Sequence, residues 1–267
     1  MATSATFYLN ASTFALATAA FADVNLTILA PDGFYSDGTG AVREQVLGTL
    51  GAITTCPSCV AKTIVYGTLY NWAAITDPRG ITPIGWHIPD WLEAYTLDTY
   101  INGPVDGGQK LKSADPSFWT PSTGTDAYGF NFRGTGYRDN LGGFGGLNEI
   151  GNMWGSTTTT PTTGQGSSCE AATNVFNKWT GFNRLDGVPV RFLKDNSIDP
   201  GTVIDYDGNV YPTVTIGTQV WTAQNLIVEH YNNGDPIPNV TLDSDWASLT
   251  TGALCYYNNN VNNAYII

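Results

Sequence analysis

Residues 66–89 read YGTLYNWAAITDPRGITPIGWHIP, and this stretch decides how the rest of the chain is interpreted. Apolar residues alternate at its start, which predicts a strand within Lys62–Trp72. Apolar residues then recur at helical spacing over Pro89–Tyr100, with Asp90 placed to cap the first turn. A glycine-containing segment, Gly103–Gly108, is expected to close that helix.

The last third of the chain carries a second patterned stretch. Val210–Leu226 predicts a strand, a turn at Gly217 and a second strand. The chain then ends on the apolar residues Tyr265–Ile267, which we interpret as an edge strand that pairs with Thr63–Tyr66. Between the two patterned regions, Asp195–Gly201 reads DNSIDPG and predicts a short exposed loop.

These stretches resemble the Fibrobacter succinogenes major paralogous domain, which is common in Bacteroidota and belongs to the C-type-lectin-like superfold. The resemblance covers about three quarters of the chain. It is carried by the stretch quoted above and by four further motifs: GGQKLK at 107–112, GYRD at 136–139, VIDYDGNVYPTVTIGTQVWTAQNL at 203–226 and CYYNNN at 255–260.

The order of these motifs is reversed relative to the family. The resemblance implies that residues 203–267 are the family's opening half and residues 61–195 its closing half, joined through residues 196–202. We therefore expect a circularly permuted domain over 61–267, or half-domains shared between neighbouring subunits. Because the ends of compact domains are often close together, permutation is tolerated.

The resemblance implies an α+β fold of the C-type-lectin-like class. From Ser113 to Gly181 the chain is Gly, Ser, Thr and Asn interleaved with aromatics, which we interpret as the long irregular loops of that fold. Residues 1–60 have their own pattern of short apolar runs and turns, with one helix predicted at Phe14–Ala22. This segment resembles a small, mostly β attachment module of surface proteins in Bacteroidota and their phages.

Charge and composition exclude several classes of function. The net charge is −12 with eleven Lys and Arg, which argues against binding to nucleic acid or to anionic membranes. No apolar run approaches the roughly 18 residues needed to cross a bilayer. Only 13% of residues are charged, about half the usual share, and the polar surface is instead Thr, Ser, Asn and Gly. No basic segment opens the chain, so a secretory signal peptide is not expected.

Metal and thiol chemistry is weakly indicated. Cys56 and Cys59 are in CxxC spacing, whereas Cys169 and Cys255 are far apart; free thiols, a zinc site and disulfides all remain open. The Asp clusters at 205–209 and 243–245 suit Asx turns, with calcium as a second interpretation. We expect no cofactor.

Catalysis is not expected either. Formylglycine-generating enzyme shares the superfold, but its oxidase chemistry depends on a pair of cysteines, and no such pair lies in the matched region. The two histidines, His87 and His230, lie in different halves, and no GxSxG nucleophile elbow occurs. We interpret His87 as a core or capping residue. A shared fold does not carry activity by itself.

The expected function is recognition by a virion protein. A surface of the extracellular type, in a chain without an export signal, favours a phage fibre or capsid decoration. Such a protein would lie on the virion surface and bind a host glycan or protein. It would contact other virion proteins through residues 1–60 and form a homo-oligomer. The alternatives are a purely architectural subunit that polymerises by strand or half-domain exchange, and a bacterial cell-surface adhesin.

The ligand-binding side chains are expected among the aromatics of the half that supplies the variable face in ligand-binding relatives. Aromatic rings offer stacking surfaces at low entropic cost. By the same resemblance, Trp72, Trp86 and Trp221 are expected to be core. The candidate binding residues are Tyr128, Tyr137, Trp154, Phe176, Trp179 and Phe182.

Overall fold

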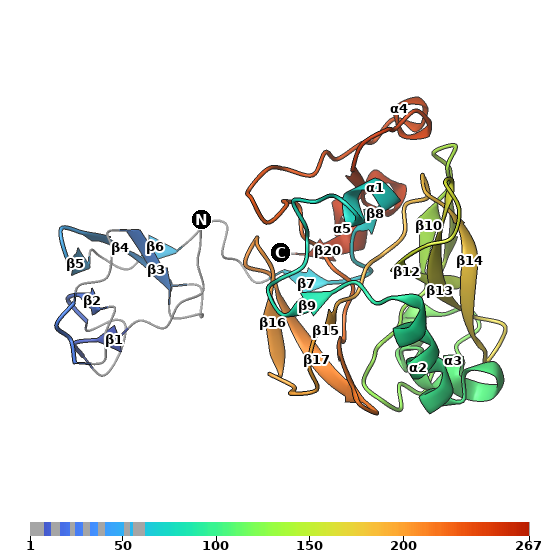
Figure 1. Ribbon diagram of the computed structural model, residues 1–267, viewed down its shortest axis with the longest axis horizontal. Coiled ribbons are helices and arrows are strands. Elements are labelled where there is room, and N and C mark those ends of the chain that lie inside the picture. The colour runs from blue at the N-terminus through green and yellow to red at the C-terminus, as the bar shows by residue number, and fades with distance from the viewer. Residues whose placement is uncertain are drawn as a thin grey trace. The chain divides into compact units, whose positions relative to one another are not determined.

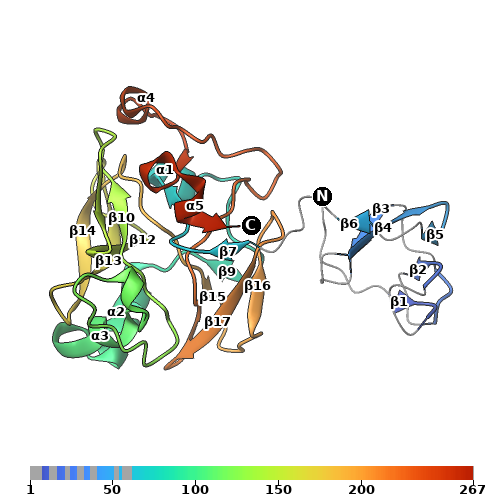
Figure 2. The same ribbon diagram turned by 180° about the vertical axis from the view of Figure 1, so that it is seen from behind.

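The protein consists of two compact units. The computed structural model describes residues 8–11, 17–21, 25–28, 33–36, 41–50, 54–55 and 62–266 (Figures 1 and 2). Unit 1 lies within residues 1–62, and unit 2 is Thr63–Ile266. Unit 2 is a mixed domain, mostly strands with few helices, which agrees with the predicted mixed class.

The described part of unit 1 consists of short antiparallel strands. They are β1 (Tyr8–Leu9), β2 (Ala20–Phe21), β3 (Gly33–Ser36), β4 (Ala41–Val46), β5 (Thr49–Leu50) and β6 (Thr54–Thr55). β1 pairs with β2, and β4 pairs with β3, β5 and β6. Gln45 on β4 joins the two sheets: its Oε1 accepts from Ala20 N at 2.6 Å, and its Nε2 donates to Ala20 O at 3.3 Å.

The prediction of a helix at Phe14–Ala22 is wrong for residues 17–21, the part of this range that the structure describes. Residues 17–21 are described, and Ala20–Phe21 form β2 instead. Alanine-rich composition favoured a helix, but pairing with β1 and the Gln45 amide fixes the backbone here as extended. The rest of the predicted helix lies outside the described residues.

A five-stranded antiparallel sheet organises unit 2. Its order is β16-β17-β18-β15-β9. The strands are β9 (Trp86–His87), β15 (Leu193–Lys194), β16 (Thr202–Ile204), β17 (Val210–Ile216) and β18 (Gln219–Thr222). Leu193 pairs with Trp221 on one side and with His87 on the other. The sheet is therefore built from both sides of the 195–201 segment, and the predicted strand, Gly217 turn and strand are confirmed.

The structure contains the exposed loop predicted at 195–201 and the strand pairing predicted between the end of the chain and Thr63–Tyr66. Residues 195–201 form an exposed connection between β15 and β16. The last strand, β20 (Tyr265–Ile266), pairs antiparallel with β7 (Thr63–Ile64), with Ile266 opposite Thr63. β19 (Leu254–Cys255) pairs in the same chain with β8 (Leu69–Tyr70). The predicted edge pairing is thus confirmed within one chain.

A regular sheet replaces the irregular loops predicted for Ser113–Gly181. β12 (Ile150–Thr158), β13 (Thr163–Glu170) and β14 (Phe176–Asn183) form a three-stranded antiparallel sheet. Beside it, β10 (Thr135–Arg138) pairs with β11 (Phe144–Leu147). The prediction failed because Gly, Ser and Asn have low strand propensity, yet here these small residues are buried on both faces of β13.

Short elements complete unit 2. Gly67, with φ +87°, lies between β7 and β8, and Asn71 caps α1 (Trp72–Ile75). The single strand predicted for Lys62–Trp72 is therefore two short strands and a helix start. The remaining helices are α2 (Trp91–Ile101), α3 (Gly108–Leu111), α4 (Asp243–Ala247), α5 (Val261–Ala264), a π-turn at 103–107 and 3₁₀ turns at 116–118 and 257–259.

Two large core clusters hold unit 2 together, and the second of them includes residues of α2 and α3. The largest cluster holds 22 buried residues, including Trp72, Trp86 and Trp154. A second cluster packs Leu97 and Ile101 of α2 against the inner face of β12–β14 and against Trp221. Figures 1 and 2 both show α2 and α3 beside the lower end of that sheet. The three tryptophans expected in the core are buried.

The start of α2 is fixed by a capping box and by a histidine. The Asp90 carboxylate accepts from Glu93 N, and the Glu93 carboxylate accepts from Asp90 N, both at 2.8 Å. The predicted helix and its cap are confirmed. His87 lies between Glu93, 2.8 Å from its Nε2, and Asp195, 2.7 Å from its Nδ1. The Glu93 carboxylate and then Asp195 raise the pKa of His87 to about 9, against the effect of burial.

This arrangement makes stability depend on pH. A histidine pKa raised by folding adds stability that is complete below its unfolded value and is lost as pH passes the folded value near 9. His87→Gln should lower the free energy of unfolding at pH 6 by about 1 kcal/mol, a small effect because the side chain is 37% exposed and screened. Urea unfolding at pH 6 and pH 10 checks this. A difference between the two proteins that is the same at both pH values would contradict it.

Candidate functional site

Strand alternation gives the β12–β14 sheet two different faces. On β12, Asn152 and Trp154 point to one side and Met153 to the other. Asn152 is opposite Ser168 on β13, and Gly166 is opposite both Trp154 on β12 and Trp179 on β14. Met153 belongs to the core cluster under α2. The face that carries Asn152 therefore points away from α2 and is the candidate surface.

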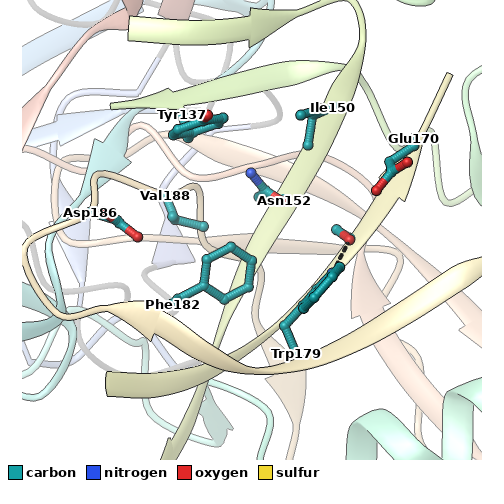
Figure 3. A pocket seen from close by; sticks show the side chains of 9 residues that line it. Tyr137, Ile150, Asn152, Glu170, Trp179, Phe182, Asp186 and Val188 are labelled. Atoms are coloured by element: carbon teal, nitrogen blue, oxygen red, sulfur yellow. Dashed lines mark hydrogen bonds between the residues drawn. The ribbon is translucent and has the colours of Figure 1, made fainter. Parts of the chain in front are cut away.

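A pocket of about 270 Å³ opens on this face. Figure 3 shows its lining, to which β10, β12, β13, β14 and the loop after β14 contribute. The lining residues are Tyr137, Ile150, Asn152, Ser168, Glu170, Trp179, Phe182, Asp186 and Val188. The volume is at the lower end of the range for small-molecule sites, and the pocket is open to solvent, so it suits one unit of a longer ligand.

Aromatic rings form one wall of the pocket. The Trp179 indole N–H donates to Ser168 Oγ at 2.6 Å, while the side chain is 48% exposed. Its only polar group is thus satisfied by the protein, and the exposed ring is left for stacking. Phe182 packs edge-on against Trp154, with ring centroids 5.6 Å apart. Glycine at 166 is required, because a Cβ there would lie 2.5 Å from the Phe182 ring.

Carboxylates mark the two ends of the pocket. Figure 3 shows Asp186 at one end and Glu170 at the other, with Asn152 and Phe182 between them. Asp186 Oδ2 accepts from Asn183 N at 2.9 Å. Burial raises the pKa of Asp186 to about 6, and the negative charge of Asp139 adds to the shift. No lysine, arginine or histidine is among the lining residues.

The structure brings together three of the six predicted binding residues. Tyr137, Trp179 and Phe182 all line the pocket. Tyr128 is half-buried elsewhere, beside the second core cluster, with its ring 5.9 Å from that of Tyr100.

Trp154 and Phe176 are corrections to the prediction. Trp154 is 0% exposed, covered by Trp72 and Phe182, and its Nε1 donates to Tyr70 O at 2.7 Å. Phe176 is opposite Cys169, on the face of the sheet that packs under α2, and is buried there. Neither side chain is accessible to a ligand.

Sequence reasoning missed the polar side of the pocket. Asn152, Ser168, Glu170 and Asp186 were not singled out, because the segment that carries three of them was interpreted as loops. Recognising β12 and β13 as strands would have placed Asn152, Ser168 and Glu170 on one face by their period of two. Asp186 is followed by Gly187, and this Asp-Gly pair predicts a turn. It does not predict that the Asp186 side chain lines the pocket.

A second hollow lies beside His87 but has a structural explanation. Its lining includes Ile81, His87, Asp90 and Glu93. The polar groups there are engaged with one another: His87 with Glu93, and Asp90 with the first turn of α2. They stabilise the helix start and leave little for a ligand.

The groups considered for metal or thiol chemistry are also engaged. Asp205 Oδ1 accepts from the backbone N of Asp207 and Asn209, which is the predicted Asx turn. Asp243 Oδ1 accepts from Arg138 at 2.9 Å. Within the described ranges, no group of three or more His, Cys, Asp or Glu side chains is arranged to hold a metal.

The two described cysteines, Cys169 and Cys255, are buried free thiols. Burial raises the pKa of Cys255 to about 12 and that of Cys169 further, so both thiols stay protonated. Cys56 and Cys59 lie outside the described residues. Among the helices that are described, none has the length and apolar character needed to span a membrane.

Fold and pocket together define the class as a mixed α and β domain, mostly strands, with a solvent-open aromatic and acidic pocket. The Fibrobacter succinogenes major domain matches residues 49–194, which is more than half of the chain. The chain therefore belongs to this family. All nine pocket residues lie inside the matched range. Comparisons with curated proteins and with solved structures find no match.

Proposed function

We propose that this protein is a non-enzymatic binding protein that recognises saccharides in the pocket on the β12–β14 sheet. The single observation that carries the proposal is Trp179, which is 48% exposed while its indole N–H is held by Ser168. Sugar rings present C–H faces that stack on an aromatic ring and hydroxyl edges that hydrogen-bond. Around Trp179 the pocket offers polar partners for those hydroxyls from Asn152, Glu170 and Asp186.

The biological setting we propose is the surface of a phage particle that infects Bacteroidota, as a fibre or a capsid decoration. A surface low in charge and rich in Thr, Ser, Asn and Gly supports this setting, as does family membership. Unit 1 would attach the protein to other virion proteins, and unit 2 would face the host. A bacterial surface adhesin would use the same pocket.

The finer fold proposed for unit 2 is a circularly permuted C-type-lectin-like domain. The family match ends at residue 194, directly before the exposed 195–201 loop. Residues 203–226, which resemble the family's opening half, lie outside the match and supply β17 and β18 to the sheet. Pairing of β20 with β7 and of β19 with β8 inside one chain supports a self-contained domain over one shared between subunits.

The test is binding of the full chain to a glycan array, followed by calorimetry with the oligosaccharides that bind. Trp179→Ala should weaken binding roughly tenfold or more, the loss typical of a central aromatic anchor. Tyr95→Ala is the matched control, because Tyr95 is 55% exposed and lies outside the pocket. Equal binding by the Trp179 and Tyr95 variants would remove the pocket from the proposal. Release of shortened sugars would contradict a non-enzymatic role.

A further inference from the structure

The pocket carries negative charge without a matching cation. Glu170 and Asp186 reach it from β13 and from the loop after β14, at its two ends (Figure 3). Asp186 has backbone N–H partners, from Asn183 and Asn140, while the nearby Asp139 adds to the negative potential. The nearby Lys112 ammonium donates to backbone oxygens, among them Glu170 O at 3.0 Å, and to Thr123, rather than to the Glu170 carboxylate.

The cations close in sequence are engaged elsewhere. Arg138 is buried and donates to the carbonyls of Gly142, Val240 and Thr241, and to Asp243.

Two further cations are also held away from the pocket. Arg184 stacks on Trp72, 5.3 Å from the ring centroid. Lys178 points to the opposite face of β14, where it pairs with Asp98 on α2. The charge of the pocket carboxylates is therefore open to a cation supplied by the ligand.

The aromatic wall suits the same kind of ligand. An ammonium group near the faces of Trp, Tyr or Phe is attracted by the ring quadrupole, and the attraction grows as water is excluded. Tyr137, Trp179 and Phe182 lie in one pocket with the two carboxylates. A uronic acid or a sialylated sugar would instead bring a second negative charge next to Glu170 and Asp186, which costs binding free energy.

We infer that the pocket prefers saccharides that carry a free amino group, and that it rejects acidic saccharides. The inference rests on the proposed function, since it names the class of sugar that the same pocket takes. The ammonium group is attracted by both Glu170 and Asp186, and the sugar ring stacks on Trp179. An N-acetylated sugar keeps the stacking contact but loses the ion pair, because its amide nitrogen is neutral.

The experiment is calorimetry on the full chain at pH 7, above the pKa of Asp186, and 150 mM NaCl, with three tetrasaccharides of glucosamine, N-acetylglucosamine and galacturonate. The glucosamine compound should bind at least tenfold more tightly than the N-acetylated one, and the galacturonate compound should not bind. Glu170→Gln and Asp186→Asn should each reduce the tenfold preference to threefold or less, while N-acetylglucosamine affinity stays within twofold. Asp245→Asn, an exposed carboxylate of α4 outside the pocket, is the matched control and should keep the full preference.

The outcomes separate this inference from the proposed function. Equal binding of the glucosamine and N-acetylglucosamine compounds, lost in Trp179→Ala, would overturn the inference and leave saccharide binding intact. A preference that survives both carboxylate substitutions would overturn it as well, because the net charge of the whole chain would then be its source. If none of the three compounds binds and the glycan array is also blank, the proposed function itself fails.

Discussion

Replacing Arg191 with methionine is expected to lower the free energy of unfolding by about 3–5 kcal/mol, because three buried oxygens and one part-buried oxygen would lose their donor at about 1–3 kcal/mol each, less than additively. The guanidinium is 1% exposed. It donates to Asn225 Oδ1 at 2.8 Å, to Thr222 O at 3.1 Å and to Asn131 O at 3.0 Å, and it also bonds to Phe130 O. Methionine fills similar volume but donates to none of them.

Arg184→Met is the matched control for this substitution. Arg184 is half-buried, donates to Thr163 O at 3.4 Å and stacks on Trp72. Its loss should cost about 1 kcal/mol, the usual range for one cation–π contact. Urea unfolding followed by tryptophan fluorescence measures both, with an unchanged dependence on urea showing that the same transition is compared. Similar losses for the two variants would mean that the Arg191 network adds nothing beyond an ordinary contact.

Exchanging the two halves of unit 2 in sequence should leave its fold intact, whereas either half alone should not fold. The rearranged chain would run from residue 201 to 267, through an Asn-Gly turn, and then from 62 to 195. Ile266 and Thr63 are register partners in an antiparallel pair, which places their Cα atoms about 4.5–5.5 Å apart, within reach of a hairpin turn. We expect its free energy of unfolding to lie within about 2 kcal/mol of the original order, since one short loop replaces another.

The largest core cluster is divided between the two halves, and the second cluster needs Ile216 and Trp221 from the second half. Of the 22 buried residues in the largest cluster, eleven precede residue 195 and eleven follow residue 202. Fragments 62–200 and 201–267 should therefore show no cooperative urea transition, in contrast to residues 62–267 in the original order. A cooperative transition in either fragment, or an unfolded rearranged chain, would contradict the two-halves description of the domain.

Elements with strong local signals were predictable from sequence. Asp90 and Glu93 form a capping box before an apolar run, so α2 was predicted with its cap. Gly217 has φ +63°, a conformation that favours glycine, and the apolar alternation on either side of it predicts β17 and β18. The exposed loop at 195–201 follows from its Asp, Asn, Pro and Gly content.

Elements held by tertiary packing were not predictable. β13 reads TGQGSSCE, which has neither the branched residues nor the polar alternation that identify a strand. It is a strand because β12 and β14 satisfy its backbone on both sides, and because Gly164 and Gly166 allow the rings of Trp72 and Phe182 to approach. Three aromatic pocket residues were therefore identified from their type, while Glu170 was hidden by the wrong interpretation of its segment and Asp186 gave only a turn signal.

Side chains alternate between the two faces of β13, so adjacent residues belong either to the pocket or to the core. Ser168 and Glu170 point into the pocket, whereas Cys169 between them lies in the core under α2. Ser168 is 2% exposed and accepts from the Trp179 indole N–H, so it fixes the ring in the pocket. Glu170 is half-buried, and its substitution should change what is bound with little effect on the packing that keeps the domain folded. One face of β13 thus belongs to the core, and the other face belongs to the pocket. A library that varies positions 170 and 179, and keeps the buried Asn152 and Ser168, would sample new ligand specificities on the same scaffold.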